Sequence, residues 1–587
     1  MPDFLSPGWI TTVKAWIDAC CQQEIHETCG TPDPGWLPTR LIDVDPHYST
    51  PSQSHVRLVE TKDNDKIKPN PGFAALSYCW GKGRAHELNK SASTTDTSRS
   101  RNLNRMELST LPRTIRDAVR VCRALSIPYL WVDSICIIQE NTTDFEQEAP
   151  TMAKVYGNSV FTISAVYSPD CTSGFLHHIV RLDWKRLESE VGHNIILYRG
   201  DDIDWEFMLS RYAPLAKRGW TLQERALSSR VLHFGTRTCW ECRNLQVPEL
   251  WSVQSTGDSI ERQEEMESYA RHMMPRLVPH TIPDSVGRPW LNQYWSHIIM
   301  DFSRRELSHP RDKLPALEGL ARRLQSQMAG DIYLSGLWAS YLVPEGLLWS
   351  RDPYEPAYLV HAQTTESNEP RAPSWSWAAY DGEIVTIDTL WTQLITQRYW
   401  YREEVRLATK APESRLTSYT GGRYRESIEV KGPLAAVTSV GAVAFGAICK
   451  DYGDIYELGY QCFDGLLMLS DDGGSTEPLQ HPWIAVLDET PPTELKRKRE
   501  EAKGDWDHRH GITLDWWILR MESYTYEKTY EGSSEIETVT VFSALILEQQ
   551  SGNGNVEFKR KGVAYAYRKD GAIPYPKKWK LAQVRII

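Results

Sequence analysis

Short apolar runs alternate with amphipathic segments along the first half of the chain. The run FAALSYCWG (Phe73 to Gly81) predicts a buried strand that ends at a glycine turn. The next segment, LPRTIRDAVRVCRAL, places apolar residues on one helical face, with Pro112 where a helix start tolerates it. Two further strands are predicted at YLWVDSICI and VFTISAV, with the helical segment DFEQEAPTMAKVYGNS between them. This series predicts an α/β domain with a parallel sheet and right-handed crossovers.

The pattern divides the rest of the chain into further regions. Residues 1–70 predict an amphipathic helix and two strands that pack on the α/β domain, which we place at 71–250. An insertion interrupts that domain at 169–216. Helical periodicity follows at 251–370, and short strands separated by Gly and Asp turns fill 371–587. The sequence therefore predicts a helical region and then a C-terminal β-rich module.

Two shorter segments carry finer expectations. The Ser, Thr and Arg residues at 92–103 predict a polar loop. The segment YLSGLWASYL (residues 333–342) is expected to be helical, like its neighbours.

Charge and composition limit the classes of partner. The chain has 587 residues and a formal net charge of -11, which argues against a general nucleic-acid or acidic-membrane surface. No apolar run approaches the roughly 20 residues of a membrane helix, and the N-terminus lacks the pattern of a signal peptide. We therefore expect a cytoplasmic protein without membrane or nucleic-acid partners.

Several motifs together resemble the fungal heterokaryon-incompatibility (HET) domain. In chain order they are ALSYCWG, LPRTIRDAVRVCRALSIPYLWVDSICIIQE, MAKVYGNSVFTISA and RGWTLQERALSSRVLHF, over about residues 38–240. The family is associated with cell death when genetically unlike fungal cells fuse. The resemblance implies an effector or trigger of incompatibility, which acts by self-association or with a partner protein.

The order of elements is also similar to that of TIR domains, which have a flavodoxin-like parallel fold. In NAD-cleaving TIR domains a tryptophan follows the third strand, and the catalytic glutamate comes within a turn of helix. Here that position reads Trp220, Thr221, Leu222, Gln223, Glu224. This similarity implies that Glu224 is catalytic, and that Trp220 and Gln223 help to bind NAD or a related nucleotide as substrate. Alternatively, Glu224 pairs with Arg218 or Arg225 and fixes the insertion.

Polar and aromatic residues at the ends of the first two strands are further candidates for substrate binding, since open α/β sheets bind ligands at this edge. They are Ser77, Tyr78, Trp80, Gly81, Asp133, Ser134, Cys136 and Gln139. Trp80 either stacks on a base or plugs the end of the sheet, and Gly81 allows close approach to a phosphate. Asp133 either caps the next turn or accepts a hydrogen bond from Tyr78 or Trp80. Cys136 is better explained as a buried small residue than as a nucleophile, because no histidine lies near it in sequence.

The sequence predicts no bound cofactor and no metal. It contains neither a GxGxxG nor a Walker pattern. CWEC (Cys239, Cys242) and CCQQEIHETC (with Cys20, His26 and Cys29) hold enough ligands for zinc, but they lie far apart, and buried thiols explain them better. The domain is then either a nucleotide-cleaving enzyme or a scaffold that signals by association. An enzyme needs Glu224 exposed in a pocket, whereas a scaffold permits its burial against an arginine.

Overall fold

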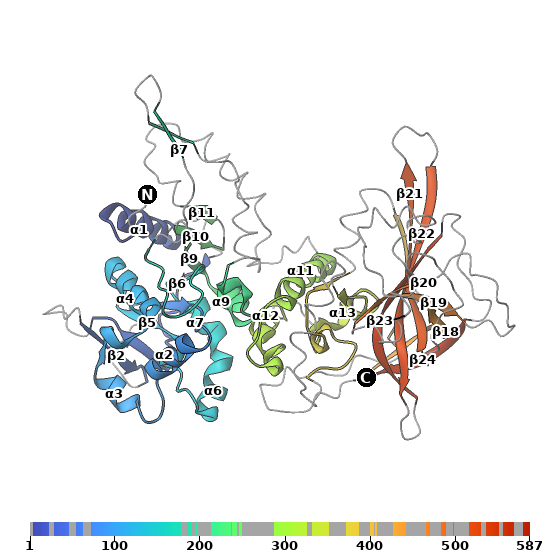
Figure 1. The fold of residues 1–587 in the computed structure, drawn as a ribbon, viewed down its shortest axis with the longest axis horizontal. Helices are drawn as coiled ribbons and strands as arrows, with labels where there is room; N and C mark the ends of the chain where they lie inside the picture. Colours follow the sequence, from blue (N-terminus) through green and yellow to red (C-terminus); the bar gives the residue numbers. More distant parts are fainter. Residues whose placement is uncertain are drawn as a thin grey trace. The chain divides into compact units, whose positions relative to one another are not determined.

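A computed structural model gives the fold of the chain (Figure 1). It describes residues 4–22, 29–45, 54–62, 72–177, 185–188, 194–197, 213–235, 238–243, 246–248, 287–325, 331–351, 371–386, 399–403, 406–407, 427–441, 465–469, 483–488, 497, 516–529, 536–550, 556–568 and 579–587. The chain forms two compact units. Unit 1 comprises 1–282 with 305–323, and unit 2 comprises 283–304 with 324–587.

Unit 1 is built on a nine-stranded sheet with four parallel strands at its centre. These are β3 (Phe73–Ser77), β5 (Tyr129–Trp131), β6 (Phe161–Ser164) and β9 (Arg230–Phe234), in the spatial order β5-β3-β6-β9. Nearly all their residues are buried, as expected for strands covered on both faces. Numbered along the chain the order is 2-1-3-4, the order of flavodoxin-like folds. The predicted α/β class and parallel sheet are confirmed.

Antiparallel strands extend this sheet on both sides. On the β5 side lie β1 (Arg40–Asp43), β2 (His55–Glu60) and β4 (Met106–Glu107). On the β9 side lie β10 (Thr238–Cys242) and β11 (Gln246–Pro248). The two strands predicted within the first 70 residues thus join the same sheet as the α/β core.

Helices flank the parallel strands. Helix α4 (Arg113–Leu125) begins after Pro112 and connects β3 to β5. Its predicted apolar face is fully buried: Ile115, Val119, Cys122 and Leu125. Helix α1 (Pro7–Gln22) contacts α4, and on the other side of the strands α7 (Met152–Asn158) contacts α9 (Trp220–Leu227) (Figure 1). The amphipathic pattern therefore identified the faces that cover the sheet.

The second predicted strand is shorter than the sequence indicated. Strand β5 ends at Trp131, and helix α5 (Asp133–Cys136) follows at once. The amides of Ile135 and Cys136 both donate to the carbonyl of Val132, which closes a helical turn. The prediction of a strand that continues beyond Trp131 is wrong. The strand ends because the Asp133 carboxylate accepts the backbone N–H of Ser134 and favours the start of a helix there.

The predicted polar loop at 92–103 is helical over half its length. Helix α2 (Arg84–Ala92) and helix α3 (Arg99–Asn104) leave only a short connection between them. Thr94 and Asn102 are buried, and the Asn102 amide donates to the Thr94 hydroxyl at 3.0 Å. The prediction of a loop failed because these polar side chains bond to one another across the connection.

In unit 2 the segment YLSGLWASYL forms a hairpin rather than the predicted helix. Strands β12 (Tyr333–Leu334) and β13 (Leu337–Trp338) pair antiparallel, and only α13 (Ala339–Leu342) is helical. Ser335 and Gly336 form the two-residue connection with φ of 41° and 98°. Two positive φ values suit a tight hairpin turn, and glycine adopts one without strain.

Buried tryptophans brace this hairpin. Trp295 and Trp377 both donate their indole N–H to the carbonyl of Gly336, each at 2.9 Å. Trp349 donates to the carbonyl of Trp375 at 3.0 Å. All four are buried. The tryptophans of this region thus fill a core and satisfy backbone oxygens there.

The C-terminal part of unit 2 is β-rich, as predicted. Its nine-stranded sheet comprises β16 (Tyr399–Glu403), β17 (Arg406–Leu407), β18 (Ile428–Gly441), β19 (Gly465–Leu469), β20 (Trp483–Leu487), β21 (Trp516–Thr529), β22 (Ile536–Gln550), β23 (Glu557–Arg568) and β24 (Lys580–Ile586). Among the described residues, the remaining α-helices and strands are α6 (Thr142–Glu148), β7 (Lys185–Glu188), β8 (Asn194–Leu197), α11 (Gly287–Ser303), α12 (Pro315–Gln325), β14 (Ser350–Arg351) and β15 (Ile384–Val385). Much of the predicted insertion at 169–216, and residues 251–286 of the predicted helical region, lie outside the described residues.

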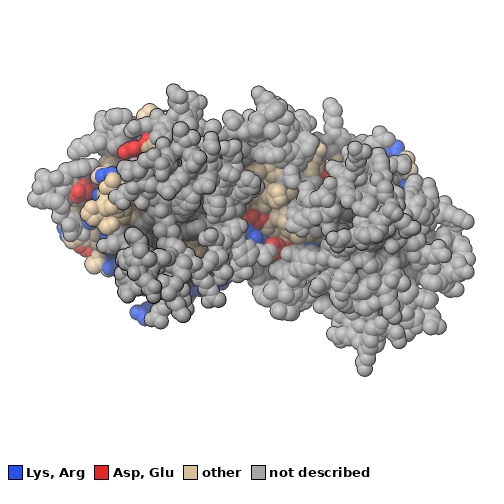
Figure 2. Space-filling model, turned by 90° about the horizontal axis from the view of Figure 1, so that it is seen from above, with Lys and Arg blue, Asp and Glu red and all other residues tan. Residues whose placement is uncertain are grey.

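The described surface shows mixed charge. On the face in Figure 2 the acidic and basic side chains are interspersed rather than gathered by sign. Within the described part of the chain, no helix combines the length and the apolar character needed to cross a membrane.

Candidate functional site

A small cavity lies at the carboxyl ends of the parallel strands of unit 1. Its volume is about 30 Å³, room for about two water molecules. The polar side chains around it come from β3, β6, β9, α9 and the segment after α11: Ser77, Thr162, Ser164, His233, Thr221, Arg225 and Arg305. The chain leaves β3 toward β5 and returns to β6 on the other side. The cavity therefore lies at the topological switch point, where open α/β sheets bind ligands.

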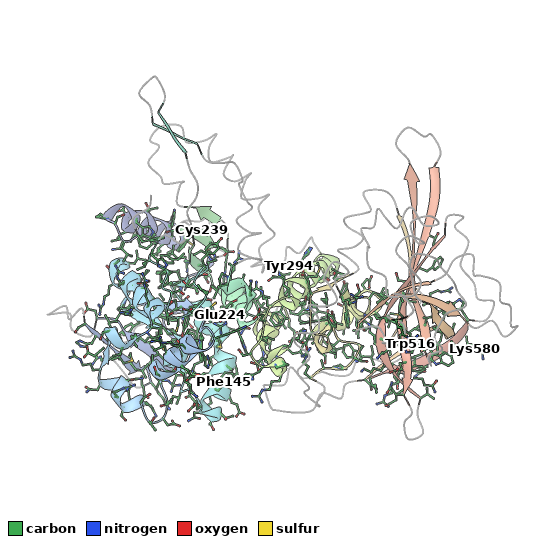
Figure 3. All side chains as sticks on the ribbon, in the orientation of Figure 1. Phe145, Glu224, Cys239, Tyr294, Trp516 and Lys580 are labelled. Carbon is green, nitrogen blue, oxygen red and sulfur yellow. The ribbon has the colours of Figure 1, made fainter. Side chains whose placement is uncertain are left out.

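Glu224 lies beside this cavity, in the second turn of α9 (Figure 3). Its side chain is only 5% exposed, and Ser77 donates its hydroxyl to Oε2 at 2.5 Å. Burial raises the pKa of Glu224 to about 7, and the positive charge of Arg218 together with hydrogen bonds from Ser77 and Tyr156 limits the rise. The carboxyl group is thus poised to change protonation near neutral pH.

Two part-buried arginines border the same edge of the sheet. Arg218 donates to the backbone carbonyl of Tyr78, one residue beyond Ser77. Arg305 donates to the carbonyl of Arg218 at 3.4 Å and to the Thr221 hydroxyl at 3.3 Å. Burial, reinforced by the nearby charge of Arg225, lowers the pKa of Arg305 to about 9. Both arginines therefore bring positive charge near the Glu224 carboxyl, while the neutral Ser77 hydroxyl donates a hydrogen bond to it.

Tyr78 links the ends of the first two parallel strands. Its hydroxyl donates to Asn89 Oδ1 at 2.8 Å and lies 2.9 Å from the Ser134 hydroxyl. All three residues are buried. Burial raises the pKa of Tyr78 well above its ordinary value, so the phenol stays protonated. Sequence reasoning placed Tyr78 and Ser134 in one region, and the structure brings them into contact.

Asp133 makes both kinds of contact that the sequence suggested. It is the first residue of α5, and its Oδ1 accepts the amide N–H of Ser134 at 2.6 Å. Its Oδ2 accepts the indole N–H of Trp80 at 3.0 Å. Burial raises the pKa of Asp133 above the ordinary range, against the charge of Arg218. Trp80 is part-buried and packs against His86, with ring centroids 6.0 Å apart.

Cys136 and Gln139 have local structural contacts. Cys136 is buried, its sulfur accepts the Val132 amide at 3.5 Å, and burial raises its pKa to about 12. The thiol therefore stays protonated, which suits a buried small side chain rather than a nucleophile. Gln139 donates its amide to the carbonyls of Asp133 and Ile137 at 3.2 and 3.0 Å.

Trp220 and Gln223 lie on α9 with Glu224 but differ in environment. The Trp220 indole donates to Asp312 Oδ2 at 3.4 Å. Gln223 is buried, and its side-chain oxygen has no hydrogen-bond partner among the described residues. A buried amide oxygen of this kind is available to a water molecule or a ligand.

Gly81 is needed for packing at the end of the first strand. It has a φ of 90°, and a Cβ there would lie 2.5 Å from the Cβ of Asp170 and 2.8 Å from that of Ala85. A larger residue would push the start of the predicted insertion away from this strand end.

An ion cluster on α9 and the neighbouring strands borders the cavity from the other side. Glu241 on β10 accepts from Arg225 Nε at 2.8 Å and lies 2.6 Å from His233 Nε2. Although burial opposes it, the charge of Arg225 holds the pKa of Glu241 well below its ordinary value. Burial lowers the pKa of His233, and its Nδ1 has no hydrogen-bond partner among the described residues. Neither His233 nor Glu241 was predicted as a site residue. The only signal in the sequence was a weak one: each is a polar residue within a mainly apolar strand segment.

Tyr156 and Arg305 were missed for a different reason. Tyr156, on α7, lies near Glu224 and donates its hydroxyl to the carbonyl of Leu76, and Arg305 lies 81 positions after Glu224 in the chain. No local spacing relates either of them to the strand ends. Only the packing of helices on the sheet brings them to the site.

A comparison with known families identifies the domain that carries this site. Residues 73–224 match the family described as Heterokaryon incompatibility protein (HET). The chain carries a HET domain. The match begins at the first residue of β3 and ends at Glu224, so the parallel strands β3, β5 and β6 and the candidate carboxylate belong to the HET domain. No curated protein and no solved structure shows significant similarity to the chain.

Proposed function

We propose that the chain is an effector or trigger of heterokaryon-incompatibility cell death, and that its HET domain hydrolyses NAD or a related nucleotide through Glu224. The observation that supports this proposal is a buried carboxyl group with a pKa of about 7 at the topological switch point of a parallel sheet. Perturbed carboxyl groups at such positions are typical of catalytic sites.

The chemistry requires one well-placed carboxylate. As the bond between nicotinamide and ribose breaks, its electron pair leaves with nicotinamide and positive charge develops on the ribose carbon. Ionised Glu224 would stabilise that charge or hold the ribose hydroxyls, and water would then add to the carbon and release a proton. Arg218 and Arg305 would favour a negatively charged substrate near this edge.

The site must open before a nucleotide can reach Glu224. Pockets for ligands of this size are about 300–1,000 Å³, ten times or more the volume of the cavity. Ser77, and not Glu224, is among the residues that line the cavity. The proposal therefore includes a closed state of the HET domain, and activity requires a change that separates Ser77 from Glu224.

A non-enzymatic scaffold is the second candidate, and the burial of Glu224 favours it. The Glu224 carboxyl group is 5% exposed and accepts a hydrogen bond from Ser77, and this contact holds α9 against β3 without any chemistry. In that case the HET domain would signal by association or by recruiting a partner, and Glu224 would do no chemistry.

Consumption of NAD by the purified full chain distinguishes these candidates. The wild type, Glu224→Gln and the control Glu306→Gln are assayed dilute and after forced oligomerisation. Glu306 is a suitable control because its carboxylate is about half exposed and pairs with exposed Lys82. We expect loss of NAD with the wild type and Glu306→Gln, and at least a hundredfold lower rate with Glu224→Gln.

The other outcomes are equally informative. Equal activity in Glu224→Gln would place the chemistry elsewhere in the domain. Absence of activity in every assembly state, with folded protein, would contradict the enzyme and favour the scaffold.

A further inference from the structure

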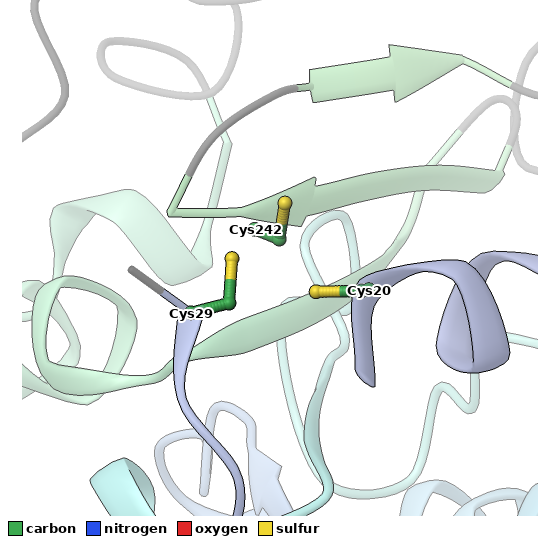
Figure 4. A group of neighbouring side chains, drawn as sticks. All are labelled: Cys20, Cys29 and Cys242. Carbon is green, nitrogen blue, oxygen red and sulfur yellow. The ribbon is translucent and has the colours of Figure 1, made fainter. Parts of the chain in front are cut away.

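Three cysteines from distant parts of the sequence meet in the core of unit 1 (Figure 4). Cys20 lies in the last turn of α1, Cys29 follows the helix, and Cys242 ends β10. Their sulfur atoms all lie within 4.8 Å of one another, and no disulfide joins them. Each side chain is at most 4% exposed. The two cysteine groups that looked too far apart in the sequence therefore converge.

The fold holds the three sulfur atoms on one side of β10. Helix α1 is fixed along this strand by Trp9, whose indole donates to the Thr238 hydroxyl at 2.8 Å, and by Trp16, whose ring lies 6.4 Å from that of Trp240. Gly30 follows Cys29 with a φ of 64°. This left-handed conformation is unfavourable for other residues and turns the chain just after the cysteine.

A buried arginine completes the surroundings of the sulfur atoms. Arg230, on β9, is 1% exposed. Its Nε donates to Cys20 Sγ at 3.2 Å, and its Nη2 donates to the carbonyl of Gly30. Among the described residues, its Nη1 has no hydrogen-bond partner and no carboxylate forms an ion pair with Arg230. A buried charge without a counter-charge is costly, so this guanidinium requires negative charge nearby.

We propose that Cys20, Cys29 and Cys242 bind a Zn²⁺ ion as thiolates. Zn²⁺ takes sulfur ligands in a tetrahedral arrangement, and three cysteines with one further ligand form a common structural site. Binding releases three thiol protons and leaves the group of one Zn²⁺ and three thiolates with a net charge of minus one. That charge offsets Arg230, whose N–H···S contact is of the kind that supports metal-bound thiolates. Arg243 brings further positive charge near Cys20 and Cys29 and would also favour thiolates there.

Three neutral thiols would satisfy the burial but leave Arg230 without a counter-charge among the described residues. A disulfide between two of the cysteines would also leave the Arg230 charge without a counter-charge, and the third cysteine would stay a lone buried thiol. The zinc ion accounts for the sulfur cluster and for the buried guanidinium together. Its role is structural: it joins the end of α1 and the segment after it to β10.

The test measures the zinc content of the full chain, purified with its thiols reduced and then equilibrated with buffered Zn²⁺. We expect about one Zn²⁺ per wild-type chain and more than about tenfold less in Cys242→Ser. The matched control is Cys239→Ser, on the same strand three residues earlier and outside the cluster, and it should keep its zinc. With Co²⁺ in place of Zn²⁺, the wild type should show the absorption bands of sulfur bonded to cobalt.

A second measurement covers the case in which Cys242→Ser does not fold. A zinc chelator should lower the melting temperature of the wild-type chain, and Zn²⁺ but not Mg²⁺ should restore it. The proposal is overturned if the reduced wild type binds no zinc, if Cys239→Ser loses as much zinc as Cys242→Ser, or if mass spectrometry shows two of the three cysteines joined in a disulfide.

Discussion

The Glu224 side chain is 5% exposed and that of Glu241 is 20% exposed, and their surroundings shift their pKa values in opposite directions. Glu224 meets mainly neutral donors, and burial raises its pKa to about 7. Glu241 contacts Arg225 and His233 directly, and the charge of Arg225 lowers its pKa despite burial. The direct contacts of Glu241 with Arg225 and His233 account for the opposite direction of its pKa shift.

These opposite shifts predict opposite effects of pH on stability. The folded-state pKa of Glu224 exceeds its ordinary value of 4.5, so its contribution is full below pH 4.5 and is lost as the pH rises toward 7. Ionisation of this group costs the folded state about 3 kcal/mol. Glu224→Gln, which stays neutral, should therefore gain stability over the wild type by about 3 kcal/mol between pH 5 and pH 8, measured by denaturant unfolding of the full chain.

Glu241→Gln provides the contrast. The stability that Glu241 contributes is present above pH 4.5 and is lost only in acid. The unfolding free energy of this variant should therefore be lower than that of the wild type by a similar amount at pH 5 and pH 8. A Glu224→Gln variant whose difference from the wild type did not change between these pH values would show that Glu224 is ionised throughout.

Individual site residues were partly predictable from the sequence. Ser77, Tyr78 and Asp133 could be assigned to one edge of the sheet because each follows an apolar strand, and parallel strands end at the same edge. Arg230 and Arg305 could not, because nothing near them in the sequence indicates which buried group they contact. A buried guanidinium is identified only by its tertiary contacts.

At the scale of elements, α4 illustrates how one helix fixes a loop far along the chain. Asp117 is buried on this helix, and its Oδ2 accepts the backbone N–H groups of Phe175 at 3.0 Å and Leu176 at 3.2 Å. Both lie in the described start of the predicted insertion. The carboxylate thus accepts hydrogen bonds from backbone N–H groups of the loop, which would otherwise need other acceptors.

Removal of this carboxylate should release the loop. Asp117→Ala leaves two buried N–H groups without their acceptor and should cost about 3 kcal/mol of unfolding free energy. Arg120→Ala removes only a part-exposed partner 3.4 Å from Asp117 and should cost less than about 1 kcal/mol. Hydrogen exchange at Phe175 and Leu176 measures the local effect. Equal exchange in the two variants would contradict the anchoring role.

Element type was predicted well where periodicity was strong and poorly where polar residues bond locally. The buried face of α4 and the strands of the C-terminal sheet followed directly from apolar spacing. The turn at Asp133 and the helix beginning at Arg99 did not, because side-chain contacts with neighbouring backbone or with a distant strand stabilise them. The hairpin at Ser335–Gly336 was missed because its apolar residues also fit a helix.

At the scale of the whole molecule, the chain passes between its two units more than once. Residues 305–323 return to unit 1 after the chain has already entered unit 2. The Gly219 amide donates to the carbonyl of Glu306 at 2.8 Å, and the Glu306 amide donates to the carbonyl of Lys217 at 2.5 Å. This late segment therefore holds the backbone that leads into α9.

A fragment that ends at residue 282 should be less stable than unit 1 in the full chain. It lacks the partners of Lys217 and Gly219, and we expect a loss of about 2–4 kcal/mol in its unfolding free energy. A peptide with the sequence of residues 301–325, added in trans, should raise the unfolding midpoint, and a scrambled peptide should not. An equal midpoint with either peptide would show that unit 1 does not need the returning segment.

The strand order also limits how the gene for such a protein can recombine. Residues 73–224 supply β3, β5 and β6, whereas β9 on one side and β1 on the other are encoded outside this interval. A crossover at these limits would transfer a sheet whose two outer parallel strands present unpaired backbone groups to water and to other chains. Productive exchange between genes should therefore favour breakpoints before residue 40 and after residue 242, so the heritable module is larger than the segment by which the family is recognised.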